Sequence, residues 1–268
     1  MMETMAPGFP LGGPGMPRAD SVPAVFDHVT IRVTDRELSE RFYSTVLIPL
    51  GIEKSYRTST FSEWQDFSLT RADRAEPPTR RLHVGFAAPT IAQVDEFHRA
   101  GIEAGYEDDG APGPRPQYGE DYYGAFLRDP DGNSVEAVNH GGMRRGGVID
   151  HVWIRVADLA SAKRFYATIA PHAGLRVVHD EPDRVQLSGP DYSFSLVQDE
   201  RPLTEHVHLA FPAREDATVR AFHAAALAAG YEDHGAPGER TVYHPGYYGA
   251  FVLDPDGNNV EVVNHNRG

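Results

Sequence analysis

The chain contains two copies of one sequence, and this repeat constrains its fold more than any other feature. The segment DHVTIRV, which begins at Asp27, recurs as DHVWIRV at Asp150. The segment YYGAFLRDPDGNSVEAVNH, which begins at Tyr122, recurs as YYGAFVLDPDGNNVEVVNH at Tyr247. The copies are offset by 123 residues near their start and by 125 later. A repeat of about 120 residues is too long for a solenoid unit and has the size of a small domain.

We therefore divide the chain into two homologous domains, residues 26–140 and 148–266. Residues 141–147 read GGMRRGG, and their glycines predict a flexible linker. Residues 1–25 are rich in Gly and Pro and have no basic segment followed by an apolar one, so they do not resemble a secretory signal. Such a segment buries too little apolar surface to offset its ordering entropy, and we expect a disordered tail.

The composition excludes several classes of protein. The 268 residues carry a formal charge of −14, and an acidic surface repels phosphate backbones, so we expect no nucleic-acid partner. No apolar run approaches the ~20 residues that span a bilayer, so we expect no membrane partner. Cysteine is absent, which excludes disulfides and thiolate ligands and agrees with a cytoplasmic protein. A metal site would therefore be built from carboxylates and some of the 13 histidines.

Within each copy, two units of strand, helix and further strands follow one another. The segments of the first copy that read as strands are 26–33, 61–70, 81–87, 122–127 and 134–138. Asp35 and Thr90 are the predicted N-caps of two helices, and Gly51 and Gly105 mark the predicted ends of those helices. Residues 108–116 read as a turn-rich loop. This order predicts an α+β protein with helices outside a sheet.

Three polar residues of each copy lie in the middle of predicted strands. Their neighbours on the opposite face are apolar and would pack on the helices, so these polar side chains point away from the helix layer. If the sheet curves, they converge in its cavity. The candidate metal ligands are His28, His83 and Glu136 in the first copy and His151, His208 and Glu261 in the second. Two imidazoles and one carboxylate suit divalent Fe, Mn, Ni or Zn and leave positions open.

These motifs give the chain a clear family resemblance. DHVxIRV, the RFY helix, LHVGF or VHLAF, and DPDGNxVE resemble the vicinal oxygen chelate superfamily, also called the glyoxalase/bleomycin resistance/extradiol dioxygenase superfamily. The resemblance covers both copies almost completely. It implies tandem glyoxalase-type domains, each of two βαβββ modules with a curved mixed sheet and helices outside. It also implies that the six residues named above are ligands of a divalent metal.

The resemblance does not select one activity. Glyoxalase I-like members use a fourth Glu or Gln ligand late in the first module, where this chain offers Asp66 in the first copy and serines in the second. Extradiol dioxygenases carry a Tyr about ten residues before the Glu ligand, where this chain has Phe126 and Phe251. Bleomycin-binding members usually lack the metal set. Fosfomycin-type thiol transferases share the two His and one Glu, but they also need cationic contacts to phosphonate.

The resemblance and the ligand set together predict a divalent-metal-dependent enzyme of the lyase or isomerase type. It would chelate two adjacent oxygens of a small substrate and stabilise an oxyanion or enediolate. The alternatives are an extradiol-type ring-cleaving dioxygenase and a metal-independent small-molecule binding or resistance protein. The chain would be a monomer with an internal pseudo-dimer or a homodimer, and the ligands of each site come from one copy or from both.

Other polar residues are candidates for contact with the substrate. Arg32 and Arg155 share the strand parity of the first histidine of each copy and could hold an anionic substrate; the alternative is a salt bridge at the sheet edge. One tyrosine of each YY pair should face the cavity, and Tyr123 and Tyr248 are the candidates for orienting or protonating substrate. His244, which the first copy lacks, is a candidate general base or a loop surface residue.

Overall fold

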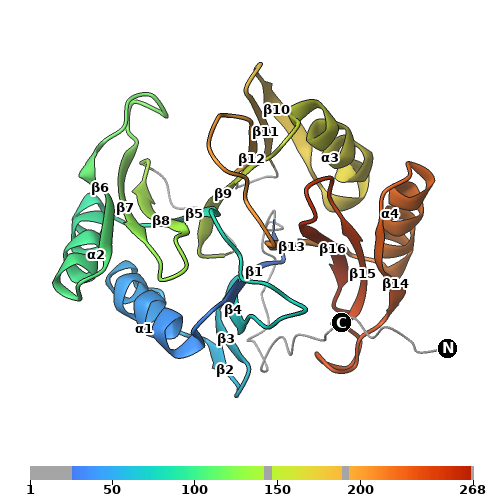
Figure 1. Ribbon diagram of the computed structural model, residues 1–268, viewed down its shortest axis with the longest axis horizontal. Coiled ribbons are helices and arrows are strands. Elements are labelled where there is room, and N and C mark those ends of the chain that lie inside the picture. The colour runs from blue at the N-terminus through green and yellow to red at the C-terminus, as the bar shows by residue number, and fades with distance from the viewer. Residues whose placement is uncertain (1–25, 142–146, 189–192, 267–268) are drawn as a thin grey trace.

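The computed structural model describes residues 26–141, 147–188 and 193–266. The predicted tail, residues 1–25, and most of the predicted linker, residues 142–146, lie outside the described residues. In the described part, two eight-stranded mixed sheets form the centre and four α-helices lie on their outer faces (Figure 1). This is the predicted α+β architecture. None of the described helices is both long enough and apolar enough to cross a membrane.

Each copy contains two βαβββ modules, as the resemblance implies. The first copy comprises β1 (His28–Val33), α1 (Arg36–Leu47), the 3₁₀-helix η1 (Ile48–Leu50), β2 (Tyr56–Arg57), β3 (Phe61–Trp64), β4 (Phe67–Arg71), β5 (His83–Ala87), α2 (Ile91–Glu103), β6 (Glu107–Pro114), β7 (Tyr123–Arg128) and β8 (Ser134–Asn139). The second copy comprises β9 (Ile149–Arg155), α3 (Leu159–Ala173), β10 (Arg176–Asp180), β11 (Arg184–Ser188), β12 (Ser193–Val197), β13 (His208–Pro212), α4 (Asp216–Ala228), β14 (Asp233–Glu239), β15 (Tyr248–Leu253) and β16 (Asn259–Asn264).

Each sheet combines one module of each copy. One sheet has the order β14-β15-β16-β13-β1-β4-β3-β2 and so joins the first module to the fourth. The other has the order β10-β11-β12-β9-β5-β8-β7-β6 and joins the second module to the third. The joints are the antiparallel pairs β1–β13 and β5–β9. The two copies are therefore interlocked through their main-chain hydrogen bonds.

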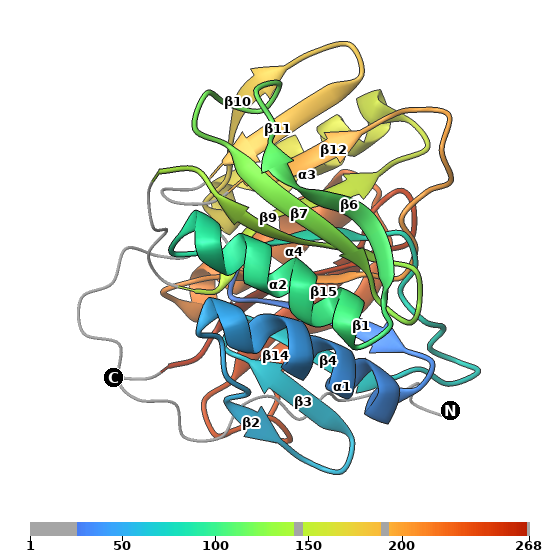
Figure 2. The same cartoon turned by 90° about the vertical axis from the view of Figure 1, so that its left-hand side faces the viewer.

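The helices keep to their own copy. Helix α1 packs on α2, and α3 packs on α4, while each helix also packs on the sheet that contains its own module (Figure 2). The strand residues that face the helices are fully buried, as the alternating pattern predicts; Val29, Ile31 and Val33 are 0% exposed. These apolar faces form one continuous core with residues from both copies.

The predicted helix boundaries are confirmed, whereas one predicted loop is a strand. The side chains of Asp35 and Thr90 accept hydrogen bonds from the first turns of α1 and α2. Gly51 and Gly105 follow the helical segments with φ of 78° and 83°, which favours glycine. The segment 108–116, predicted as a turn-rich loop, instead lies mostly in β6, whose pairing with β7 has register shifts that accommodate its glycines and prolines.

The tyrosine of the RFY motif and the first aspartate of the DPDGN motif are hydrogen-bonded to each other in each copy. The Asp129 carboxylate accepts hydrogen bonds from the main chain of its own turn and, at 2.9 Å, from the Tyr43 hydroxyl of α1. In the second copy the Tyr166 hydroxyl lies 3.2 Å from the Asp254 carboxylate. Each bond is buried and ties the helix of one module to the final turn of the next.

We predict that Tyr43→Phe and Tyr166→Phe each lower the free energy of unfolding by about 1–3 kcal/mol, because each leaves a buried carboxylate with one donor fewer. Urea denaturation followed by circular dichroism measures this change. Tyr123→Phe is the matched control: its hydroxyl contacts Asp95 at the surface, and its midpoint should stay close to that of the wild type. Equal midpoints for all four proteins would contradict the prediction.

Candidate metal centres

Among the residues that the structure describes, two groups of His and Glu side chains converge, one on each sheet. The first, which we call the His151 site, consists of His83, Glu136 and His151. His83 Nε2 lies 3.0 Å from Glu136 Oε2 and 3.0 Å from His151 Nε2, and His151 Nε2 lies 3.2 Å from the same carboxylate oxygen. His83 and His151 lie on the two strands of the β5–β9 joint, and Glu136 lies on the neighbouring strand β8.

The second group, the His28 site, consists of His28, His208 and Glu261. His208 Nε2 lies 3.1 Å from His28 Nε2 and 3.1 Å from Glu261 Oε2. The third separation, from His28 Nε2 to Glu261 Oε2, is 3.7 Å. This site is therefore wider on one side, and all three of its residues are buried.

The donor atoms fit a divalent metal ion in chemistry and in spacing. Imidazole nitrogen and carboxylate oxygen are ligands for Fe, Mn, Ni and Zn alike. Two ligand atoms that are each about 2.1 Å from one ion and at right angles to each other are about 3.0 Å apart. The separations of 3.0, 3.0 and 3.2 Å in the His151 site agree with that arrangement. An ion held here would therefore have three ligands on one side, with room for others opposite.

Each candidate set draws on both copies. The sequence leaves this pairing open, and the exchange of modules decides it: β1 carries His28 beside β13 of the second copy, and β9 carries His151 beside β5 of the first. The six predicted ligands are all brought together, but His28 and His151 join the other copy's His and Glu.

The first histidine of each copy, His28 or His151, is hydrogen-bonded to the carboxylate of the residue before it. The Nδ1 of His151 donates to Asp150 at 2.8 Å, and that carboxylate also accepts from His140 at 2.7 Å. His28, Asp27 and His265 form the same chain with distances of 2.8 Å for both bonds. Such carboxylates fix the ring and leave Nε2 facing the site. His140 and His265 thus have a clear role that the sequence does not indicate.

Hydrogen bonds set the charges in the His151 site. Burial alone would raise the pKa of Glu136, yet bonds from His151 and His83 lower that pKa to about 2. Burial likewise opposes charge on His151, but Asp150 and Glu136 raise its pKa to about 9. Burial lowers the pKa of His83. The carboxylate is therefore ionised, as a metal ligand must be, and it carries the charge that an ion would neutralise.

The second oxygen of each ligand glutamate is held by the first tyrosine of the YY pair. The Tyr122 hydroxyl donates to Glu136 Oε1 at 2.8 Å, and the Tyr247 hydroxyl donates to Glu261 Oε1 at 2.7 Å. A Cβ at Gly124 would lie 2.5 Å from Glu136 Oε1, so only glycine leaves room for this carboxylate. Tyr122 and Gly124 of the YYGAF motif are therefore part of the site.

The other predicted tyrosines lie away from both sites. The Tyr123 hydroxyl donates to Asp95 of α2, and Arg220 of α4 reaches the Tyr248 hydroxyl at 3.4 Å. The reason is strand alternation: in each pair, successive side chains point to opposite faces of the sheet, and the second tyrosine faces the helix. The structure thus places Tyr122 and Tyr247 where the sequence analysis placed Tyr123 and Tyr248.

The remaining predicted residues occupy supporting positions. Arg32 is buried and forms an ion pair with Glu76, while Arg155 pairs with Asp199 at 3.3 Å, so both correspond to the salt-bridge alternative. His244 Nε2 lies 2.8 Å from His265 Nδ1 and so joins the chain that leads to His28.

The Asp66 carboxylate, considered as a fourth ligand, does not lie with the His28 site ligands. It accepts hydrogen bonds from the main-chain N–H groups of Val148 and Ile149 at the start of the second copy. It therefore links the two copies and is not directed at a metal ion.

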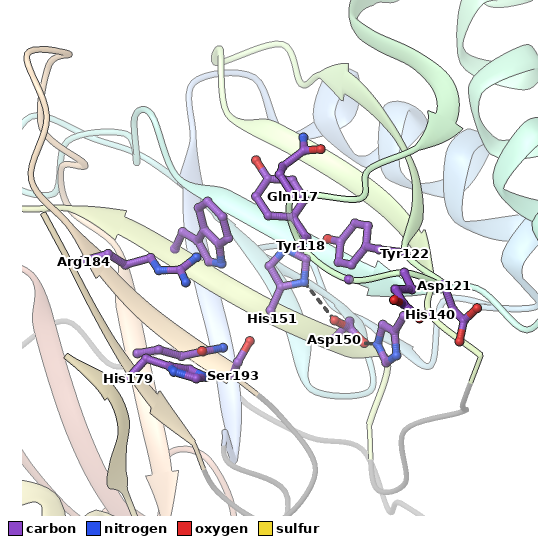
Figure 3. Close-up of a pocket in the computed structure, with 14 residues that line it drawn as sticks. Gln117, Tyr118, Asp121, Tyr122, His140, Asp150, His151, His179, Arg184 and Ser193 are labelled. Atoms are coloured by element: carbon purple, nitrogen blue, oxygen red, sulfur yellow. Dashed lines mark hydrogen bonds and ion pairs between the residues drawn. The ribbon is translucent and has the colours of Figure 1, made fainter. Parts of the chain in front are cut away.

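A pocket of about 450 Å³ opens beside the His151 site. His151 and Asp150 form its floor, and strands β9 to β12 and the 117–122 segment form its walls (Figure 3). The side chain of His83 is 13% exposed, against 2% for its counterpart His208. The His151 site is thus the more accessible of the two.

Two replacements between the copies accompany this difference. In the His28 site, Phe61 is fully buried in a cluster with Tyr247, with Tyr243 packed against it, whereas the equivalent strand position facing the His151 site is Arg184. A Cβ at Gly85 would lie 2.3 Å from the His151 ring, so the ring uses space that a methyl group would fill. The equivalent residue in the His28 site is alanine, at position 210.

We predict that two double substitutions of the candidate ligands will show that each site draws its ligands from both copies. Loaded with Zn(II) and dialysed, the wild type should hold about two ions per chain. The variant His83→Ala/His151→Ala damages one site and should hold about one ion. The variant His28→Ala/His83→Ala changes the same number of ligands, both in the first copy, and should hold almost none. Elemental analysis measures the contents, and the opposite result for the two variants would show that each site forms within one copy.

We also predict that Tyr122→Phe weakens metal binding at the His151 site about tenfold or more, because it frees the carboxylate that the hydroxyl orients. Competition with a chromophoric chelator measures the affinity. The neighbouring substitution Tyr123→Phe removes a hydroxyl of the same kind outside the site and should leave the affinity unchanged. Equal affinities for the two variants would show that Tyr122 does not support the ligand.

Comparisons with known proteins agree with this architecture. A family model described as Glyoxalase/Bleomycin resistance protein/Dioxygenase superfamily matches residues 25–137 and again 148–262. Glyoxalase I from Zea mays is a similar solved structure, with a TM-score of 0.62, 18% identity, and coverage of 90% of this chain and 92% of that chain.

A putative dioxygenase from Bacillus subtilis subsp. subtilis str. 168 has a TM-score of 0.63 at 12% identity, with coverage of 92% and 86%. At these identities the two structures show a shared fold. No curated protein matches the chain. The two family-model matches span most of the sequence, and the chain therefore belongs to the glyoxalase/bleomycin resistance protein/dioxygenase superfamily, with two tandem copies of its domain.

Proposed function

We propose that the chain is a divalent-metal-dependent enzyme that acts on a small substrate with two adjacent oxygens, at the His151 site. The observation that carries this proposal is the set of three donor atoms, 3.0–3.2 Å apart, beside a pocket of about 450 Å³. A pocket of this volume suits a small molecule, and the ligand set leaves positions for its oxygens. We assign Fe, Mn, Ni or Zn as the candidate ions.

The reaction we favour is of the lyase or isomerase type. When bound, the ion would supply electrophilic stabilisation for the oxyanion or enediolate charge that develops on the substrate oxygens. Asp150 keeps His151 oriented, and Tyr122 keeps one oxygen of Glu136 engaged, while the other oxygen faces His83 and His151. Burial and the Glu136 carboxylate raise the pKa of Tyr122, so its phenol keeps its proton.

A separate group must move the substrate proton. Of the described residues, Tyr118, Glu120 and His179 line the pocket and carry groups that exchange protons in enzymes. The predicted residues Tyr123, Tyr248 and His244 do not line it. We therefore expect one of these pocket residues to move the proton.

We predict that metal-free protein is inactive and that one of Fe(II), Mn(II), Ni(II) or Zn(II) restores turnover. The substrate screen compares thiohemiacetals of 2-oxoaldehydes, other α-hydroxycarbonyl compounds, and catechols with oxygen uptake recorded. His151→Ala should lower kcat/KM at least a hundredfold, whereas His28→Ala, the matched change in the His28 site, should retain most activity. Oxygen uptake with catechols would favour the dioxygenase alternative. Tight binding without metal or turnover would favour a binding protein.

A further inference from the structure

The two sites present different side chains on the strand beside the ligand set. Strands β3 and β11 occupy the same place in their sheets, and their pairing with β4 and β12 defines equivalent positions. Around the His151 site the residues at these positions and on the next strand are Arg184, Gln186 and His179. Their counterparts around the His28 site are Phe61, Glu63 and Tyr56. The His151 site thus has the cation of Arg184 where the His28 site has an aromatic ring, and the amide of Gln186 where the His28 site has a carboxylate.

Arg184 lines the pocket as a half-buried cation. Among the described residues no acidic group forms an ion pair with Arg184; its guanidinium carbon lies 5.8 Å from the ring of Trp153. Arg155, two residues further along the same strand as Trp153, differs in that Asp199 already neutralises it. A partly desolvated guanidinium without a partner is a strong site for an anion, and its planar fork matches a carboxylate.

The Arg184 guanidinium and the Asp121 carboxylate lie on different sides of the pocket. Figure 3 shows Arg184 and His179 on one side of His151, and Asp121 and His140 on the other. Asp150, at the floor, is already bonded to His151 and His140 and does not compete for Arg184. An anionic group is therefore favoured at the β11 side of the pocket and repelled from the segment that carries Asp121.

An aromatic wall lies between the guanidinium and the ligand set. The Trp153 ring is 5.9 Å from the His151 ring and 5.5 Å from the Tyr118 ring, which meets it edge-on. Arg184 and the ligand histidine thus both lie within 6 Å of one indole, so a single small molecule can reach both. The same wall provides apolar contact for a flat group.

We infer that the His151 site selects a substrate that carries a carboxylate, which Arg184 binds, and a flat part that contacts Trp153. The inference adds a substrate class to the proposed function. It rests on that function in one respect, because the adjacent oxygens at the other end of the substrate face the ligand set. The His28 site has Phe61 in place of Arg184 and does not share this selectivity.

The test compares two probes on the Zn(II)-loaded full chain. Both 3,4-dihydroxybenzoate and 3,4-dihydroxybenzamide are flat and have adjacent oxygens, but only the first carries a carboxylate. Isothermal titration calorimetry gives their affinities. Tryptophan fluorescence reports where they bind, because the chain has 2 tryptophans and Trp64 is fully buried in the core. The Trp153→Phe variant identifies the part of the signal that comes from the pocket.

We expect the benzoate to bind about ten- to a hundredfold more tightly than the benzamide. Arg184→Gln should abolish this preference by weakening the benzoate alone, and Arg184→Lys should keep part of it. Arg176→Gln removes the same charge from the exposed neighbouring strand and should change neither affinity. Equal binding of the two probes, no binding of the benzoate, or a preference that survives Arg184→Gln would overturn the inference.

Metal content and turnover separate this result from the proposed function. If metal binds and turnover is found but the carboxylate preference is absent, the inference about Arg184 fails and the proposed function stands. If the preference depends on Arg184 but no metal restores turnover with any substrate, the carboxylate site stands and the enzyme proposal fails. Metal content of Arg184→Gln should equal that of the wild type, because Arg184 contacts none of the three ligands.

Discussion

The antiparallel pairing of strands across the two copies is the constraint on which the candidate sites depend. β1 pairs with β13 and β5 pairs with β9, and each joint carries the first histidine of one copy to the His and Glu of the other. Neither copy can assemble a three-ligand set by itself with this topology. The duplication therefore has a structural consequence beyond size, because it supplies within one chain the two complementary halves of each sheet.

Around each ligand set, the residues shared by both copies are those that hold the ligands in place. Asp150 and Asp27 orient the leading histidines, Tyr122 and Tyr247 hold the glutamates, and a glycine clears the space beside each carboxylate. The aspartates and tyrosines among these residues are buried or half-buried, and each would cost free energy if it were left unpaired. Their presence in both copies explains why both sets are assembled although the His28 site is the less accessible of the two.

Much of the fold could be predicted from the sequence, because the relevant signals are local. Strand alternation, N-caps at Asp35 and Thr90 and the internal repeat give the elements, the modules and the six candidate ligands that the structure brings together in two groups. The pairing of modules could not be predicted, because both ways of joining them bury the same apolar faces. The choice between Tyr122 and Tyr123 was missed because strand β7 begins at the second tyrosine and its exact register fixes which one faces the site.

The sequence analysis did not identify Arg184, and the reason is different. The signal was present in the repeat, as a difference between equivalent positions of the two copies. A comparison of the copies for shared residues finds the ligands and their supports but passes over positions that differ. Equivalent positions such as Phe61 and Arg184 carry the differences in shape and charge between the two sites. In the His28 site the aromatic ring packs on Tyr247 and fills the space, whereas in the His151 site the longer cation lies along Trp153 and leaves a pocket. Residues common to the copies thus explain how a ligand set is held, and residues that differ explain what can reach it.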